Sequence, residues 1–281
     1  MLDMHRVARA LSILEMIAAR PEGVQLSAVA AELQVNRAIP FRILTELCEL
    51  GYVMQDPDTR RYRATFKLGS LGLRQLESAG VTRWARDEIE ALAATTNELV
   101  HLAVVSGREL RYVAAARGAS SRLVIDTALT YEFPSPASAG GRAWLSTLPD
   151  VEARSILARR DRGTAANAPA HRQDLDRVMD AIARVRELGY AVIQEEMEVG
   201  INAIAAPIVP PDSPDGRAVG AVSIAGPSAR TTPQVLVSFA PALQMAAERL
   251  GQQWHVYDYL VALAKPPSED GSESAPLPVA G

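Results

Sequence analysis

The segment 26–53, LSAVAAELQVNRAIPFRILTELCELGYV, decides how this chain folds. Apolar residues recur at helical spacing in two short runs, 27–33 and 36–50, and a strand-like pattern begins at Tyr52. Two short helices joined by a tight corner form a helix-turn-helix, the unit that places its second helix in the major groove of DNA. The segment therefore predicts a DNA-binding head.

A further helix is expected before this unit, over residues 6–20. Pro21 and Gly23 end it, because proline cannot continue the hydrogen-bond ladder and glycine accepts the turn. The helical spacing predicts that it buries Val7, Leu11, Leu14 and Ile17. Ser27 is the expected N-cap of the second helix, and Asn36 can cap the free amides of the third. The expected buried side of the third helix is Ile39, Ile43, Leu44, Leu47 and Leu50.

The third helix is the predicted recognition helix. Its cations precede its carboxylates, so inserting the N-terminal turns would bring arginines to DNA and keep Glu46 and Glu49 away from phosphates. Arg42 is the best candidate for a base-edge contact, since a guanidinium matches guanine bidentately. The residues expected to face DNA are Asn36, Arg37, Ala38, Phe41, Arg42 and Thr45.

A strand, a turn and a second strand follow, over 52–55, 56–59 and 60–63. The turn Asp-Pro-Asp is favourable because proline fixes φ and aspartate bonds its own backbone. This hairpin is the expected wing of a winged helix. Arg60 and Arg61 are predicted at its tip, in reach of phosphates or a minor groove.

Composition supports two domains and no membrane span. The 281 residues are 48% hydrophobic, but no apolar run is long enough to cross a bilayer and no signal peptide is recognisable. The single cysteine, Cys48, excludes an internal disulfide and favours a reducing, cytoplasmic location. The first 75 residues carry ten Lys and Arg against eight Asp and Glu, and the rest nineteen against twenty-five. A mildly basic head on an acidic body suits a DNA-binding module with a regulatory module.

Beyond the head, the patterns predict an α+β body. Helices are expected at 66–78 and 81–97, then a hairpin of strands at 99–105 and 109–115. Further helices are expected at 140–146, 151–159, 171–188 and 233–251, and further strands at 190–195, 201–209 and 219–224. Antiparallel strands with helices grouped beside them make an α+β sheet domain.

The chain resembles the IclR family of bacterial transcription regulators over residues 5–253. The resemblance rests on the order and spacing of several short pieces: 6–15, 49–53, 61–69, 101–105, 139–143, 189–191, Glu195-Glu196, Gly200, 203–207 and 223–227. One turn departs from the family, because Ala38-Ile39-Pro40 stands where Ser-Thr-Val is usual. The resemblance therefore does not carry the usual phosphate contact over to this turn, and Pro40 requires a first-turn position in its helix. Arg42 keeps its place.

The resemblance implies a division of the chain and a mode of assembly. It implies a winged helix-turn-helix over 1–65, a connector helix over 66–80 and a GAF-like effector-binding domain over 81–256. The remaining residues, 257–281, are rich in Pro, Ser and Gly, are expected to be disordered and are assigned no function. Leu68, Leu71 and Leu76 can pack on the head or on a second subunit. The family favours a dimer, with a tetramer possible, and two-fold symmetry implies near-palindromic operator DNA.

A ligand site is expected at the turn Ser138–Arg142. Ser138 can cap a helix whose first amides are bared by Gly140 and Gly141, and an anion fits such an end. The alternative is a tight helix entry without a ligand. The resemblance places a small effector, often a carboxylate, beside Ser138, Ala139, Gly140, Ile193, Ile201, Ala203, Ser223 and Ala225. The family often has Asp, Cys and Ser at 193, 203 and 225, so the apolar residues here favour an aromatic or branched acid.

Other functional classes have less support. Ser138, His101 and Asp126 offer a nucleophile, a base and an orienting group, but no nucleophile elbow surrounds Ser138. Glu195 and Glu196 are adjacent on an expected strand and so point to opposite faces, which excludes an acid/base pair. The four histidines lack metal-ligand spacing, and no phosphate-binding loop is present, so no metal or cofactor is expected. A winged helix that binds protein is the main alternative, and DNA binding differs from it by steep salt dependence.

Overall fold

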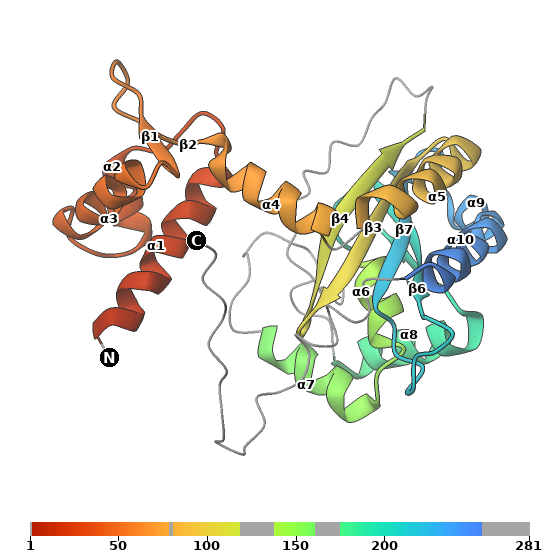
Figure 1. Ribbon diagram of the computed structural model, residues 1–281. Helices are drawn as coiled ribbons and strands as arrows, with labels where there is room; N and C mark the ends of the chain where they lie inside the picture. Colours follow the sequence, from red (N-terminus) through yellow and green to blue (C-terminus); the bar gives the residue numbers. More distant parts are fainter. Residues whose placement is uncertain (1, 79–80, 119–137, 161–174, 255–281) are drawn as a thin grey trace. The chain divides into compact units, whose positions relative to one another are not determined.

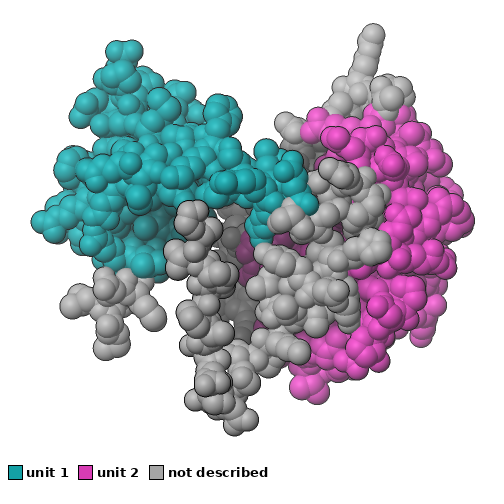
Figure 2. Space-filling view, in the orientation of Figure 1, with its two compact units in different colours: residues 1–78 teal, residues 79–281 magenta. Residues whose placement is uncertain are grey.

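The computed structural model describes residues 2–78, 81–118, 138–160 and 175–254. The chain divides into two compact units, Met1–Ser78 (unit 1) and Ala79–Gly281 (unit 2), which are coloured separately in Figure 2. Asp126 and the tail 257–281 lie outside the described residues. Within those residues, no helix combines the length and the apolar character that a bilayer span requires.

Unit 1 is a winged helix-turn-helix (Figure 1). Its elements are α1 (Leu2–Ala18), α2 (Leu26–Glu32), α3 (Ala38–Glu49), β1 (Val53–Gln55), β2 (Tyr62–Ala64) and α4 (Phe66–Ser78). β1 and β2 pair antiparallel, with Val53 opposite Ala64. Val24 adds an isolated bridge to Tyr62, which ties the α1–α2 connection to the wing. The shared core is formed mainly by Ile13, Ile17, Val24, Val29, Ile43, Leu44, Leu47, Val53 and Tyr62.

The predicted buried face of α1 was wrong in its first half. Val7 and Leu11 are 61% and 55% exposed, whereas Ile13 and Ile17 are fully buried. Both stripes have helical spacing, so periodicity alone cannot choose between them. The contacts of α1 with α3 and β2 decide, and they leave the stripe of Val7 and Leu11 uncovered within the described residues.

The predicted cap of α2 was also wrong. The helix begins at Leu26, with Gln25 at the N-cap and no capping side-chain bond. The bridge from Val24 to Tyr62 fixes the chain just before the helix, so tertiary pairing sets the entry instead of Ser27. The Asn36 side chain does accept the Ala38 amide hydrogen at 3.1 Å.

The first-turn position expected for Pro40 in α3 is confirmed, whereas the burial expected for Leu50 at the end of α3 is wrong. Pro40 is the third residue of α3, where its missing N–H leaves no bond unmade. Leu50 was expected in the core but is 59% exposed. It is the C-cap residue, and Gly51 at φ +75° turns the chain away directly after it.

Unit 2 is built on a five-stranded antiparallel sheet in the order β4-β3-β7-β6-β5. Its strands are β3 (Leu99–Ser106), β4 (Glu109–Arg117), β5 (Ala191–Gln194), β6 (Ile201–Ile208) and β7 (Gly220–Pro227). Its helices are α5 (Val81–Thr96), α6 (Ala139–Leu145), α7 (Asp150–Arg160), α8 (Leu175–Leu188), α9 (Pro233–Ser238) and α10 (Ala240–Gln252). The predicted α+β class with an antiparallel sheet is confirmed.

Helices cover both faces of this sheet (Figure 1). α5, α9 and α10 pack with Val100, Leu102 and Ile224 into the larger core. α6, α7 and α8 cover the other face, where Ala103 and Ala221 meet Trp144. Because successive side chains of a strand point to opposite faces, the sheet divides its apolar residues between two cores.

Two predicted elements of unit 2 were wrong in part. The single helix expected over 233–251 is two helices, broken at Phe239, because Pro241 cannot donate the bond that would continue the first one. The strand expected over 190–195 ends at Gln194. Glu195 has φ +53°, which no strand residue adopts, so Glu195 and Glu196 lie in the connection to β6.

Unit 2 stability should depend on the centre of the sheet. Ile224 is fully buried in β7, so Ile224→Ala is expected to lower the free energy of unfolding by about 2–5 kcal/mol. All three tryptophans, Trp84, Trp144 and Trp254, lie in unit 2, so their fluorescence during denaturant unfolding reports this unit. The control Val151→Ala, at an 84% exposed site, should change it by less than about 0.5 kcal/mol. Equal effects of the two changes would contradict this account of the core.

Candidate functional site

The exposed face of α3 carries the predicted DNA-facing residues. All six of Asn36, Arg37, Ala38, Phe41, Arg42 and Thr45 are exposed. Arg37 and Arg42 form no ion pair with any residue that the structure describes, so both guanidinium groups are open to a ligand. The hydroxyl of Thr45 donates to the Phe41 carbonyl oxygen at 2.9 Å and is partly engaged.

One carboxylate on this helix has a partner that sequence reasoning missed. Arg6 of α1 forms an ion pair with Glu46 of α3. The two residues are forty positions apart, so only the packing of α1 on α3 brings them together. The pair offsets a negative charge that would otherwise repel phosphates.

The two arginines predicted at the tip of the wing lie in different surroundings. Asp56 accepts the amide hydrogens of Asp58 and Thr59 at 3.0 and 2.8 Å, which builds the turn as expected and lowers the pKa of Asp56. Arg60 is exposed at φ +57° beside this turn. Arg61 instead donates from Nη1 to the Gly23 carbonyl oxygen at 2.9 Å, so its side chain lies against the α1–α2 connection.

A cavity of about 60 Å³ in unit 2 gathers seven of the eight residues predicted to bind an effector. The predicted lining residues are Ala139, Gly140, Ile193, Ile201, Ala203, Ser223 and Ala225. Strand register explains the gathering, because Ala203 lies opposite both Ile193 and Ala225 in the sheet. Strand pairing brings the residues of β5, β6 and β7 together, and the packing of α6 on the sheet adds Ala139 and Gly140.

Ser138, the eighth predicted residue, serves the helix rather than the cavity. Its hydroxyl accepts the Gly141 amide hydrogen at 2.8 Å and caps α6. A Cβ on Gly140 would lie 3.5 Å from Leu110 Cδ2, an ordinary van der Waals distance. The absence of a side chain at Gly140 therefore leaves space in the cavity, although a methyl group there would not clash. Ser138 is not among the described residues that line the cavity with His101, so the cavity does not bring this candidate nucleophile and base together.

Four cavity residues were missed: His101, Tyr112, Met197 and Glu198. The His101 and Tyr112 rings stack with centroids 4.5 Å apart. Burial, helped by the positive charge of Arg117, lowers the pKa of His101 to about 4, so the ring is neutral at pH 7. A correct strand register would have placed His101 opposite Ser223, which was predicted to line the cavity, and would so have identified His101.

The described lining of the cavity is mostly apolar and carries no arginine or lysine. Glu198 is its single carboxylate. The uncharged imidazole and the phenol ring of Tyr112 form a stacked aromatic part of the lining, and isoleucine and alanine side chains make up much of the rest. Such a surface suits an apolar or aromatic body with few polar groups.

Sequence profiles of two known domains match the chain in order. A profile described as "IclR helix-turn-helix domain" matches residues 6–57. A second, described as "Bacterial transcriptional regulator IclR C-terminal", matches residues 73–252. Among curated proteins, the HTH-type transcriptional regulator XynR of Escherichia coli is 26% identical over 246 residues, covering 88% of this chain and 95% of XynR.

Solved structures share the fold. An IclR transcriptional regulator from Alicyclobacillus acidocaldarius has a TM-score of 0.74 and 24% identity, covering 92% of this chain and 98% of its own. An IclR homologue from Microbacterium hydrocarbonoxydans, complexed with 4-hydroxybenzoate, has a TM-score of 0.64 and 19% identity, covering 86% and 98%. At these identities the two structures show the likeness of the fold.

The buried state of His101 should make unit 2 less stable in mild acid. The pKa is about 4 in the folded chain against 6.5 when unfolded, so between these values the unfolded chain binds the extra proton. Stability is therefore lost as the pH falls, by about 2 kcal/mol between pH 7 and pH 5. In tryptophan-monitored unfolding, His101→Phe, which keeps an aromatic ring beside Tyr112, should lose that much less over this interval. An unchanged pH dependence in the variant would contradict the assignment.

Proposed function

We propose that this chain, which belongs to the IclR family of bacterial transcriptional regulators, binds a near-palindromic operator through unit 1. A small molecule in the unit 2 cavity then lowers or raises the affinity for that operator. The observation that carries the DNA-binding part is the exposed face of α3, with Arg37 and Arg42 lacking carboxylate partners among the described residues. The relatives are transcriptional regulators, not enzymes, and this holds at the level of the family.

Within the interface, the residues take different roles. Arg42, on the second turn of α3, reads a guanine edge through its two-pronged guanidinium. Arg37 and Arg60 bind phosphates and set the position of the head, while Arg61, held by the Gly23 carbonyl oxygen, supports the wing from its base. Asn36, Ala38, Phe41 and Thr45 complete the surface that faces the groove. Glu46 stays clear of the phosphates because it is paired with Arg6.

Apolar side chains exposed on the described part of unit 1 support the proposal that the chain self-associates. Val7 and Leu11 on α1 are exposed, as are Leu68, Leu71 and Leu73 on α4. Burying such side chains against a second copy is favourable by roughly 25 cal/mol per Å² of apolar area. We propose a dimer, or a tetramer of two dimers, with α4 within the 66–80 connector between the 1–65 head and the 81–256 body. Two-fold symmetry then makes the operator near-palindromic.

The effector proposed for the cavity is an aromatic or branched carboxylic acid. The stacked His101 and Tyr112 rings and the apolar lining support a hydrophobic body. The backbone amides of Ala139 and Gly140, the first two residues of α6, are the donors proposed for its carboxylate. The homologue complexed with 4-hydroxybenzoate supports an aromatic acid in this class of fold.

Repression is the proposed outcome of operator binding. A bound head that blocks access to a promoter requires no further contact with the transcription machinery. The effector acts only if it prefers one arrangement of the paired heads, so its differential affinity sets the size of the response.

Replacing Arg42 tests the DNA-binding proposal. Arg42→Ala should weaken binding to the specific operator by about 1–3 kcal/mol and spare binding to random DNA, because the lost contact is to a base edge. Fluorescence anisotropy with both duplexes over a range of salt concentrations measures this. The control Arg86→Ala removes an exposed arginine of α5 and should leave both affinities unchanged. Equal loss on random DNA would assign Arg42 to phosphate binding, and salt-independent binding would favour a protein-interaction module.

Filling the cavity tests the effector proposal. Calorimetry should detect 4-hydroxybenzoate binding more tightly than glyoxylate, because only the aromatic acid buries a ring against His101 and Tyr112. Ala203→Leu places three more carbons in the cavity and should weaken aromatic-acid binding by at least about tenfold. Tryptophan fluorescence checks that the variant remains folded. Preference for glyoxylate would exclude the aromatic-acid assignment.

A further inference from the structure

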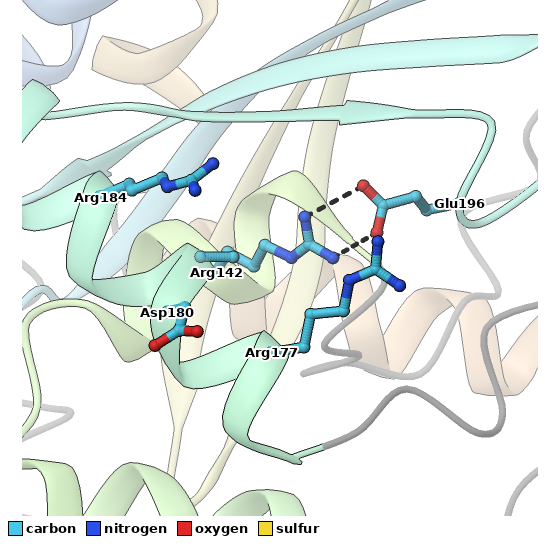
Figure 3. Close-up of a pocket in the computed structure, with 6 residues that line it drawn as sticks. Arg142, Arg177, Asp180, Arg184 and Glu196 are labelled. Atoms are coloured by element: carbon cyan, nitrogen blue, oxygen red, sulfur yellow. Dashed lines mark hydrogen bonds and ion pairs between the residues drawn. The ribbon is translucent and has the colours of Figure 1, made fainter.

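A second, larger pocket of about 440 Å³ lies in unit 2 and shares no lining residue with the effector cavity. Figure 3 shows its walls, in which the Arg177 side chain of α8 extends toward the pair formed by Arg142 of α6 and Glu196. The described lining is Arg142, Arg177, Asp180, Ala181, Arg184 and Glu196. A volume of this size is typical of small-molecule sites.

Three arginines and two carboxylates give this lining an excess of positive charge. Arg142 is nearly buried, with its side chain 7% exposed, and both of its terminal nitrogens bind the Glu196 carboxylate. This pair occupies one guanidinium and one carboxylate. Arg177 and Arg184 form no ion pair or hydrogen bond with any residue that the structure describes. Apart from the Arg142–Glu196 pair, the described walls therefore present two guanidinium groups and one carboxylate, Asp180, which is an excess of one positive charge.

The spacing of these cations follows from the helix. Arg177, Asp180, Ala181 and Arg184 stand at i, i+3, i+4 and i+7, so they share one face of α8. Arg177 and Arg184 are two turns apart, which places their backbones about 10.5 Å apart along the axis. Asp180 lies between them, and the small side chain of Ala181 leaves the floor open. Along this face of α8, the pocket thus presents a guanidinium group toward each end and a carboxylate acceptor between them.

We propose that this pocket is a second ligand site, for an elongated dianion that carries hydroxyl or amino groups between its two anionic ends. Each end receives one guanidinium of α8, which binds carboxylate and phosphate oxygens bidentately. The Asp180 carboxylate accepts from the donors in the middle of the ligand. A monoanion satisfies only one of the two arginines, and a dianion without donors leaves Asp180 facing an apolar chain.

Two six-carbon diacids separate these requirements. Galactarate has four hydroxyl groups between its carboxylates, and adipate has the same chain with none. In calorimetry on the full chain, galactarate should bind one to one, and at least about tenfold more tightly than adipate or acetate. Neither operator DNA nor an occupant of the effector cavity enters this measurement, so its result does not depend on the proposed regulatory function.

Charge-neutral variants locate the binding. Arg177→Gln and Arg184→Gln remove exposed side chains without hydrogen-bond partners among the described residues, so the fold should be kept and tryptophan fluorescence checks it. Each should weaken galactarate binding by at least about tenfold. Arg86→Gln, which removes an equal charge from an exposed site on α5, should not. Glu196 and Arg142 are left intact, because their pair anchors the pocket wall.

Each contrary result is decisive. The proposal is overturned if galactarate shows no saturable binding, or if it binds equally well to the two α8 variants. Equal weakening in Arg86→Gln would show a diffuse charge effect and overturn the assignment to this pocket. Equal affinity for adipate and galactarate would overturn the donor requirement and with it the ligand class proposed.

Discussion

The alternation of side chains along the paired strands β3, β7 and β6 is the constraint on which unit 2 depends. Val100, Leu102 and Ile224 point to the core beneath α5 and α10, while their neighbours point to the face beneath α6. Register then aligns the residues of that second face, with His101 opposite Ser223 and Ala203 opposite Ala225. A shift of one residue in any of these pairings would exchange core and cavity residues. The same pairing that stabilises the sheet therefore brings together the strand residues that line the cavity beside His101 and Tyr112.

Helix α6 turns this sheet face into two distinct sites. Its first residues, Ala139 and Gly140, line the apolar cavity, and Arg142 points to the charged pocket. Glu196, which Arg142 holds, is followed directly by Met197 and Glu198 of the cavity wall. A nearly buried ion pair is costly to break, because the charge left behind loses both solvent and partner. The Arg142–Glu196 pair thus fixes the α6 start and the β5–β6 connection against each other, and the shape of both sites depends on it.

Sequence alone supports the class of fold and most of the cavity, for different reasons. The helix-turn-helix follows from the two apolar runs and the wing from the Asp56 turn, and tertiary contacts reinforce these local signals. Seven cavity residues were found because the resemblance to a family carried their positions over. His101 and Tyr112 were missed because their place depends on which face of a strand they take, and isolated strands do not show it. The burial of Ile13 in place of Val7 was missed for a related reason, since α1 has apolar residues on more than one face.

The unusual start of α3 changes how unit 1 must hold DNA. Ala38 and Pro40 supply no side-chain donor, and Pro40 is buried, so this turn offers phosphates fewer groups than a hydroxyl-bearing turn does. The Asn36 side chain accepts the Ala38 amide hydrogen through Oδ1, so only its Nδ2 group can donate to a phosphate. The larger side chains exposed on this part of α3 are those of Arg37, Phe41 and Arg42. Positioning then falls mainly to guanidinium groups, whose phosphate contacts weaken with salt, and the apolar ring of Phe41 matches a thymine methyl better than a phosphate. In the proposed interface, the sequence of this one turn therefore favours arginine-mediated over hydroxyl-mediated contact with DNA.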